Sequence, residues 1–187
     1  MDLLTALDAA TREFGRRLAL VDDGMWTHAT PCPGWDVRYL AAHVVGGNRF
    51  AAAILGGMAA SDAIDDVMSV PQLGDDPVQA WETTALVQAA AFGAEGALER
   101  RVDHPLGEIT AREFLAFRVF DITLHAWDLA RSVGADEQLG APLVDAVLAV
   151  VVGGPPGMGF GIAPLGTTDQ DSSPQARLLD LTGRRGG

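Results

Sequence analysis

The stretch 115-LAFRVFDITLHAWDLARSVG-134 decides the fold, because its length and its apolar content are typical of a buried helix. Upstream of it, Thr110 and Glu113 have the spacing of a capping box, in which the hydroxyl accepts from a backbone amide and the carboxylate reaches back. Gly134 suits the C-terminal stop of a helix. The sequence therefore predicts a buried helix over residues 111–133.

Four polar residues interrupt this apolar helix, namely Arg118, Asp121, His125 and Asp128. At about 100° per residue they fall within an arc of roughly 80°. A stripe facing solvent would give the same pattern. Surface stripes, however, usually carry long side chains such as glutamate and lysine, whereas aspartate and histidine are short and directed. The stripe is therefore a candidate functional site.

A metal centre is the sharpest interpretation of this stripe. Asp121 and His125 are one helical turn apart, so both can reach the same ion. A catalytic zinc-type site needs a third protein ligand, and His43 in the apolar helix over 36–56 is the best donor. Each feature alone has a simpler explanation, a core histidine or an ion pair. Together they favour a triad of His43, Asp121 and His125.

Three further residues are candidates for catalytic roles. Arg118 pairs with Asp121 or Asp128, or else binds an anionic group of a substrate. Asp128 either orients a neighbouring ligand or accepts a proton. Tyr39, on the same face as His43, would orient a polar group of the substrate.

The remaining chemically notable residues have simpler expected roles. Cys32 lies between two prolines, where it is either inert or close to the pocket. His28 and His104 lie in loops and are expected at the surface. Trp35 and Trp127 are expected to anchor the core.

The other helices follow from hydrophobic periodicity and from their start signals. Asp36 suits the N-cap of the second helix, and Ser172 with Gln175 suits the start of the last. The sequence predicts further helices at 3–23, 36–56, 77–100, 141–152 and 173–181. It also predicts a polar connection over 58–76, an extended link over 100–110 and an irregular Gly/Pro-rich segment over 153–172. The expected fold is an all-α, up-and-down four-helix bundle with an extra C-terminal helix, a single domain over 1–187.

Composition excludes several classes of function. The chain has 187 residues, a formal net charge of −12 and no lysine, so neither nucleic acid nor an anionic membrane is an expected partner. Its single cysteine permits no intrachain disulfide. The acidic, amphipathic N-terminus does not have the pattern of a signal peptide, and no apolar run is long enough to span a bilayer. A cytoplasmic protein is therefore expected, with a small-molecule substrate; the sequence is also compatible with a homodimer.

Two segments carry a family resemblance: TPCPGWDVRYLAAHVVG and FDITLHAWDLARSVG. They resemble the signature segments of the mycothiol-dependent maleylpyruvate isomerase N-terminal domain family, a branch of the DinB/YfiT-like metal-binding bundles. The ending over residues 171–185 resembles a single-domain actinobacterial subgroup. The resemblance implies a divalent metal, commonly zinc, held by His43, Asp121 and His125. It also implies a low-molecular-weight thiol such as mycothiol as cosubstrate.

Two departures from that family affect the expected reaction. The isomerase has a separate C-terminal domain, which a chain of this length has no room for, and it has glutamate where this chain has Asp121. The first hypothesis is a metal-dependent S-transferase or isomerase acting on a small electrophile with a thiol. The second is a bundle enzyme recruited to a biosynthetic cyclisation, lyase or hydrolysis step, with pocket residues as acid and base. The third is a non-catalytic protein that binds a metal or a ligand.

Overall fold

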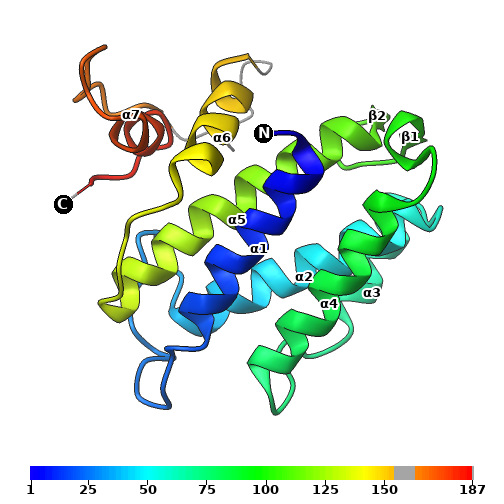
Figure 1. Cartoon of the computed structure of the whole chain (residues 1–187). Helices are drawn as coiled ribbons and strands as arrows, with labels where there is room; N and C mark the ends of the chain where they lie inside the picture. The colour runs from blue at the N-terminus through cyan, green and yellow to red at the C-terminus, as the bar shows by residue number, and fades with distance from the viewer. Residues whose placement is uncertain (154–162, 187) are drawn as a thin grey trace.

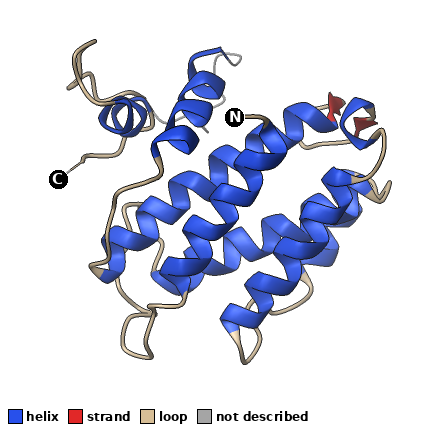
Figure 2. Ribbon diagram, viewed as in Figure 1, coloured by secondary structure: helices blue, strands red, loops and turns tan. Residues whose placement is uncertain are grey.

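The computed structural model describes residues 1–153 and 163–186, and Figures 1 and 2 show that helices make up most of them. The helices are α1 (Leu3–Leu18), α2 (Val37–Leu55), α3 (Ala60–Met68), α4 (Pro77–Gly93), α5 (Ala111–Val133), α6 (Ala141–Gly153) and α7 (Pro174–Leu181). A 3-10 turn, η1 (Ala97–Glu99), and two short strands, β1 (Arg101–Val102) and β2 (Ile109–Thr110), lie between α4 and α5. The all-α prediction is confirmed.

The bundle is built from α1, α2, α4 and α5 (Figure 1). α1 packs against α5 and α4, and α2 packs against α4 and α5. α6 lies against α5 and α1, and α7 packs on α6. None of the helices in residues 1–153 and 163–186 is long and apolar enough to cross a membrane.

The central helix α5 forms as the sequence predicts. Thr110 Oγ1 accepts from the backbone N–H of Glu113 at 3.1 Å, and Glu113 Oε2 accepts from the backbone N–H of Thr110 at 2.7 Å. The helix ends at Val133, and Gly134 has a left-handed φ of 68° that favours glycine. Nearly all of the helix after its first turn is buried, so its polar stripe lies inside the molecule.

Two helix ends were predicted wrongly. α1 ends at Leu18 rather than near residue 23, because the next backbone bonds are the tighter turns from Leu20 to Arg17 and from Val21 to Leu18. α4 ends at Gly93 rather than at residue 100. Ala94 is extended and the chain then turns at Gly96, whose φ is 69°.

The predicted polar connection over 58–76 contains a helix, α3. Its N-terminus is capped from far away in the sequence, since Asp103 Oδ2 accepts from the backbone N–H of Ala60 at 2.8 Å. Within the helix, the side chains of Ala60 and Ala63 are buried. A helix with so short an apolar face depends on these tertiary contacts, so local periodicity did not reveal it.

The remaining predictions concern the links and the C-terminal part. The link over 100–110 forms a small antiparallel hairpin, in which Arg101 pairs with Thr110. α7 is capped by Ser173, which accepts from the N–H of Ala176, and not by Ser172 as predicted. Residues 163–172 are irregular as expected, and the rest of the predicted Gly/Pro-rich segment, 154–162, lies outside the described residues.

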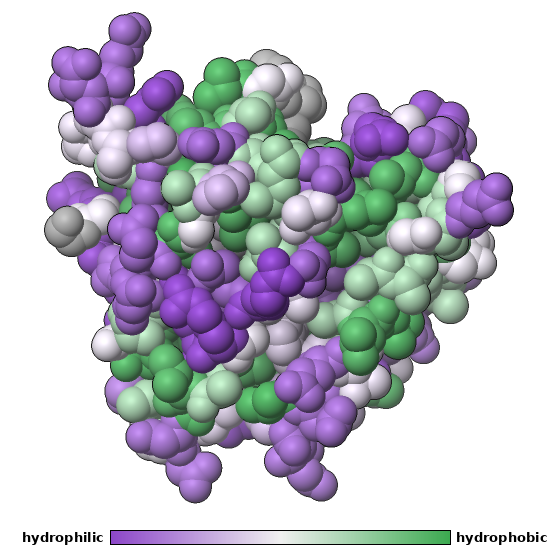
Figure 3. Space-filling view, viewed as in Figure 1, coloured by the Kyte–Doolittle hydropathy of each residue, from purple (hydrophilic) through white to green (hydrophobic). Residues whose placement is uncertain are grey.

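The surface mixes charge with apolar side chains. Figure 3 shows hydrophobic patches interspersed with hydrophilic residues over the face seen in Figure 1. Leu86 and Val87 of α4 are among the exposed apolar residues. The single-domain assignment over residues 1–187 stays a prediction.

Candidate metal centre and its surroundings

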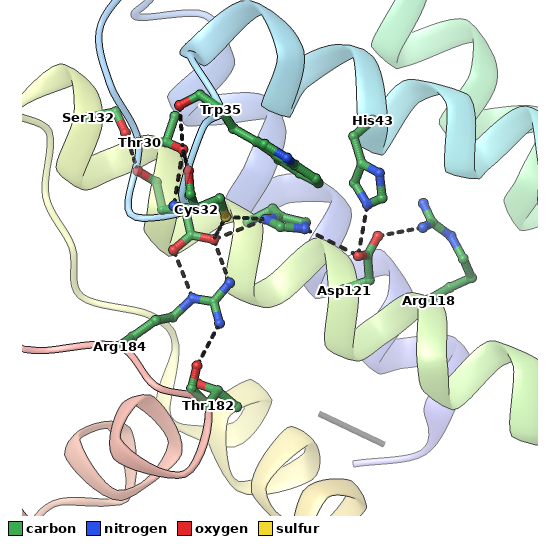
Figure 4. A network of polar contacts seen from close by, with 11 residues as sticks. Thr30, Cys32, Trp35, His43, Arg118, Asp121, Ser132, Thr182 and Arg184 are labelled. Atoms are coloured by element: carbon green, nitrogen blue, oxygen red, sulfur yellow. Dashed lines mark hydrogen bonds and ion pairs between the residues drawn. The ribbon is translucent and has the colours of Figure 1, made fainter. Parts of the chain in front are cut away.

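Three side chains from two helices meet at the middle of α5. Asp121 Oδ1 lies 3.2 Å from His43 Nε2 of α2 and 3.3 Å from His125 Nε2, one turn along α5 (Figure 4). Asp121 and His125 are buried, whereas the side chain of His43 is 39% exposed. The three residues singled out by spacing are therefore brought together, with one side open.

The charge of Asp121 is set by its neighbours. Burial opposes its ionisation, but the nearby rings of His43 and His125 hold the pKa of the carboxyl well below its usual value. Burial likewise disfavours a charged His125 ring, yet the Asp121 carboxylate raises its pKa well above the ordinary histidine value. The cluster thus holds a proton in a place where a cation can replace it.

Arg118 stands behind Asp121, on the side away from the histidines. Its Nη1 donates to Asp121 Oδ2 at 2.6 Å, so of the two carboxylates considered from the sequence Arg118 pairs with Asp121. The guanidinium also donates to Gln88 Oε1, Asn48 Oδ1 and the carbonyl of Val44. These bonds lock Arg118 in place, and Asp121 in turn presents its other oxygen to the histidines.

Gly47 on α2 makes room for Arg118. A Cβ atom at this position would lie 2.3 Å from Arg118 Nη1 and 2.7 Å from Arg118 Cζ. We therefore expect Gly47→Ala to displace the guanidinium and to lower the free energy of unfolding by about 1–3 kcal/mol. Gly93→Ala is the control, because among the described residues no atom outside its own stretch of helix lies within 4 Å of its Cβ position at the end of α4. Urea unfolding of both variants checks this, and equal stabilities would contradict it.

Asp128, the fourth residue of the stripe, is fully buried and orients His125. Its Oδ2 lies 2.9 Å from His125 Nδ1, and the Arg184 guanidinium donates to both of its oxygens at 2.8 and 2.7 Å (Figure 4). Burial opposes its ionisation, but the hydrogen bonds from His125 and Arg184 lower its pKa. An ionised Asp128 fixes the proton of His125 on Nδ1 and leaves Nε2 directed at Asp121.

Arg184 was missed by sequence reasoning. It follows α7 in a non-helical segment and reaches a partner 56 positions earlier in the chain. Its own Nη1 also donates to the carbonyl of Thr182 at 3.0 Å. No periodic pattern marks such a residue, so only the folded chain reveals it.

Cys32 is half-buried and lies beside Asp128 and His125. Its Sγ is 3.3 Å from Asp128 Oδ2 and 3.9 Å from His125 Nδ1. The loop that carries it is held by Thr30, whose hydroxyl accepts from the Cys32 N–H. Of the two sequence alternatives, proximity to the site describes its position.

Cys32, His125 and Asp128 form a second group whose ligand atoms are close enough to share an ion. Arg184 places its positive charge on both oxygens of that carboxylate, which opposes a cation there. The first group is therefore the better metal seat.

An aromatic wall closes the site on one side. The Trp35 ring lies 4.8 Å from His43 and 5.6 Å from His125, between ring centroids, and Tyr39 packs on Trp35 at 4.7 Å. Trp35 packs against the core and is half-buried, so it is also a wall of the site, whereas Trp127 is fully buried as predicted. Tyr39 is 56% exposed at the rim.

The two loop histidines differ. His28 is exposed as predicted, and its Nδ1 lies 3.1 Å from the carbonyl of Ser132 at the end of α5. His104 is half-buried among Phe50, Phe114 and Phe117, which corrects the expectation of a surface residue.

A cavity of about 760 Å³ opens next to the histidine–aspartate cluster. It lies between α2, α3, the hairpin loop and the first half of α5, and His43, Arg118 and Asp121 form part of its lining. The cluster is therefore reachable from a pocket of the size that small molecules occupy.

Bundle and site together define a class of protein, the helical bundles that place a histidine–carboxylate cluster between two helices. Two solved crystal structures of mycothiol-dependent maleylpyruvate isomerase, one of them a histidine-to-alanine mutant, share this fold. The mutant matches with a TM-score of 0.63 at 19% identity, and the other structure with 0.58 at 20%. Each match covers 80% of this chain and 68% of that chain. At this identity the likeness is one of fold.

The family follows from the sequence comparison. The model described as the mycothiol maleylpyruvate isomerase N-terminal domain matches residues 7–130, and the chain belongs to that family. Uncharacterized proteins from two strains of Mycobacterium tuberculosis are 34% identical over 143 residues, which is 76% of this chain and 74% of theirs. The resemblance drawn from the two signature segments is confirmed.

Proposed function

We propose that this protein is a divalent-metal-dependent enzyme that uses a low-molecular-weight thiol such as mycothiol. It would act on a small electrophile, either by transferring the thiol to it or by isomerising it. The observation that carries the proposal is the convergence of His43, Asp121 and His125 beside a cavity that His43 and Asp121 help to line. Membership in a family described by mycothiol and maleylpyruvate isomerase supports the choice of a thiol.

The donor set fits a zinc-type ion. Two ligands bonded at about 2.1 Å in a tetrahedron lie about 3.4 Å apart, close to the separations of Asp121 Oδ1 from the two histidine nitrogens. Two imidazoles and one carboxylate are a common catalytic set, which leaves a position for an exogenous ligand. His43, Asp121 and His125 would hold the ion, and the ion would supply acidification of a bound thiol.

The chain's own residues have distinct roles in this proposal. His125 Nδ1 lies 2.9 Å from Asp128 Oδ2, so Nδ1 would carry the hydrogen and Nε2 would bind the ion, and Asp128 is itself held by Arg184. We assign Asp128 to positioning and not to proton transfer with the substrate, since it is fully buried and both of its oxygens are occupied. Arg118 fixes the orientation of Asp121.

A substrate would enter and be oriented on the open side of the site. Tyr39, exposed at the rim, lines the cavity and is placed to hydrogen-bond a polar group of a substrate. Trp35 covers the two histidines on the loop side and excludes water there. Thiol and electrophile would thus enter from the cavity.

Elemental analysis of the purified protein tests the metal. We expect about one equivalent of zinc or a similar divalent ion per chain, as for a site with three protein ligands. His43→Ala is expected to reduce the metal content to background, because it removes one of the three. His28→Ala is the matched control, since this histidine is exposed and its ring lies against the carbonyl of Ser132 at the end of α5, away from the cluster.

A conjugation assay tests the thiol. The metal-loaded protein is expected to accelerate reaction of mycothiol with a model electrophile, and His43→Ala is expected to lose the acceleration. Absence of metal after zinc loading would overturn the metal site. A metal-loaded protein that accelerates no thiol reaction would leave the recruited biosynthetic enzyme or the binding protein as the better description.

A further inference from the structure

We propose that the cavity between α2, α3 and the hairpin loop binds the body of the substrate, and that this body is uncharged and apolar, aromatic or branched. The inference rests on the proposed function, because the reacting end of such a molecule would lie at His43 and Asp121. It assigns a substrate class different from a dicarboxylic acid.

The walls of the cavity are mostly apolar, and Gln72 is the uncharged amide among its polar lining residues. Apolar side chains come from α2, from α3 and the segment after it, from the hairpin loop and from α5. They are Phe50, Ile64, Val67, Met68, Val70, Leu106, Phe114 and Phe117. Burial of apolar surface is favourable, so an apolar ligand that fills these walls is held mainly by contacts with these side chains.

Aromatic rings form one part of the cavity wall. The His104 ring lies 5.0 Å from Phe114 in an edge-to-face arrangement and 5.7 Å from Phe117 in a stacked one. Phe50 meets both His104 and Phe114 edge to face. Such a group offers ring faces and edges at the spacing that aromatic ligands prefer.

The positive charges that line the cavity are not available to an anion. Arg118 already makes four hydrogen bonds, and its charge is neutralised by Asp121 at 2.6 Å. His43 directs Nε2 at the same carboxylate. A dicarboxylate entering the cavity would therefore lose its hydration without gaining a free cation.

His104 is the other basic side chain in the lining, and its surroundings favour the neutral ring. Its Nδ1 accepts from the backbone N–H of Leu106 at 3.2 Å. Burial lowers its pKa, although the nearby Asp103 opposes the shift. At neutral pH it thus presents an uncharged aromatic ring to the ligand.

Fluorescence titration with N-phenyl-1-naphthylamine, a neutral apolar probe, tests the cavity in the full-length protein. We expect saturable binding that millimolar maleate does not reverse. Ala42→Trp fills the cavity from α2. It is expected to weaken binding of the probe at least about tenfold, which corresponds to about 1.4 kcal/mol. Ala52→Trp, a half-buried position on the same helix that lines a different groove, is expected to leave binding within about twofold.

A second pair of variants covers the case in which the tryptophan disturbs folding. Ile64→Glu places a carboxylate at the rim of the cavity and is expected to weaken the probe, whereas Val87→Glu on α4 is not. Both positions are exposed, so the fold should accept the charge. Equal effects within either pair, or displacement of the probe by maleate, would overturn the proposal.

Metal analysis of the same samples separates the two proposals. Ala42→Trp is expected to keep its zinc while losing the probe, and His43→Ala to lose zinc while keeping the probe. A protein that binds the probe but no metal would contradict the proposed function and retain the apolar cavity. A metal-loaded protein that fails to bind the probe would contradict the substrate class alone.

Discussion

Asp121→Asn is expected to abolish metal binding and to lower the free energy of unfolding by about 3–5 kcal/mol, the range for breaking a buried ion pair. The reason is that the two oxygens of Asp121 have different partners. Its Oδ1 faces His43 and His125, while its Oδ2 pairs with Arg118, which is only 5% exposed. The substitution removes the carboxylate ligand and leaves the guanidinium buried with no countercharge beside it.

The double variant Asp121→Asn with Arg118→Met separates these two effects. Removing both charges is expected to recover most of the lost stability, because no uncompensated ion remains buried. Metal binding is not expected to return, since the ligand is still missing. Urea unfolding and elemental analysis read the two effects independently. A stable single variant that retains its metal would contradict both assigned roles of Asp121.

Arg184→Met is expected to lower the free energy of unfolding by about 3 kcal/mol, the lower end of the range for a broken buried pair. Asp128 is fully buried, and Arg184 supplies hydrogen bonds to both of its oxygens. Asp128 keeps its contact with His125 in the variant, which limits the loss. Thermal and urea unfolding measure it.

The same variant is expected to lower the affinity for zinc about 10- to 100-fold, as other losses of a residue that orients a metal ligand do. A freed Asp128 no longer fixes the ring of His125, so Nε2 is less firmly directed at the site. Arg185→Met is the matched control, because the neighbouring side chain is exposed. If the two methionine variants unfold and bind zinc alike, the positioning role of Arg184 is wrong.

Arg184 also shows why the chain after residue 130 matters. The family model ends there, yet α6 packs on α5, α7 packs on α6, and Arg184 follows α7. The C-terminal segment thus supplies a contact to the layer behind the histidines. In this chain the support of His125 therefore comes partly from outside the family-matching region.

The predictable parts of the molecule are those governed by local rules. The capping box of Thr110 and Glu113, the cap at Asp36 and the stop at Gly134 depend on neighbours within a few residues, so the sequence determined α5 and α2 closely. Spacing along α5 also put Asp121 and His125 on one face, because 3.6 residues per turn fix that geometry.

What the tertiary structure decided depends on contacts between distant segments. The cap of α3 comes from Asp103, the partner of Asp128 is Arg184, and the neutral ring of His104 rests against Phe114 and Phe117. No periodicity encodes such meetings. The sequence by itself determined α2, α5 and the polar stripe of α5, because helix geometry and capping are local. Only packing decided which groups neutralise that stripe and how apolar the adjoining cavity is, because burial and charge pairing arise when separate helices meet.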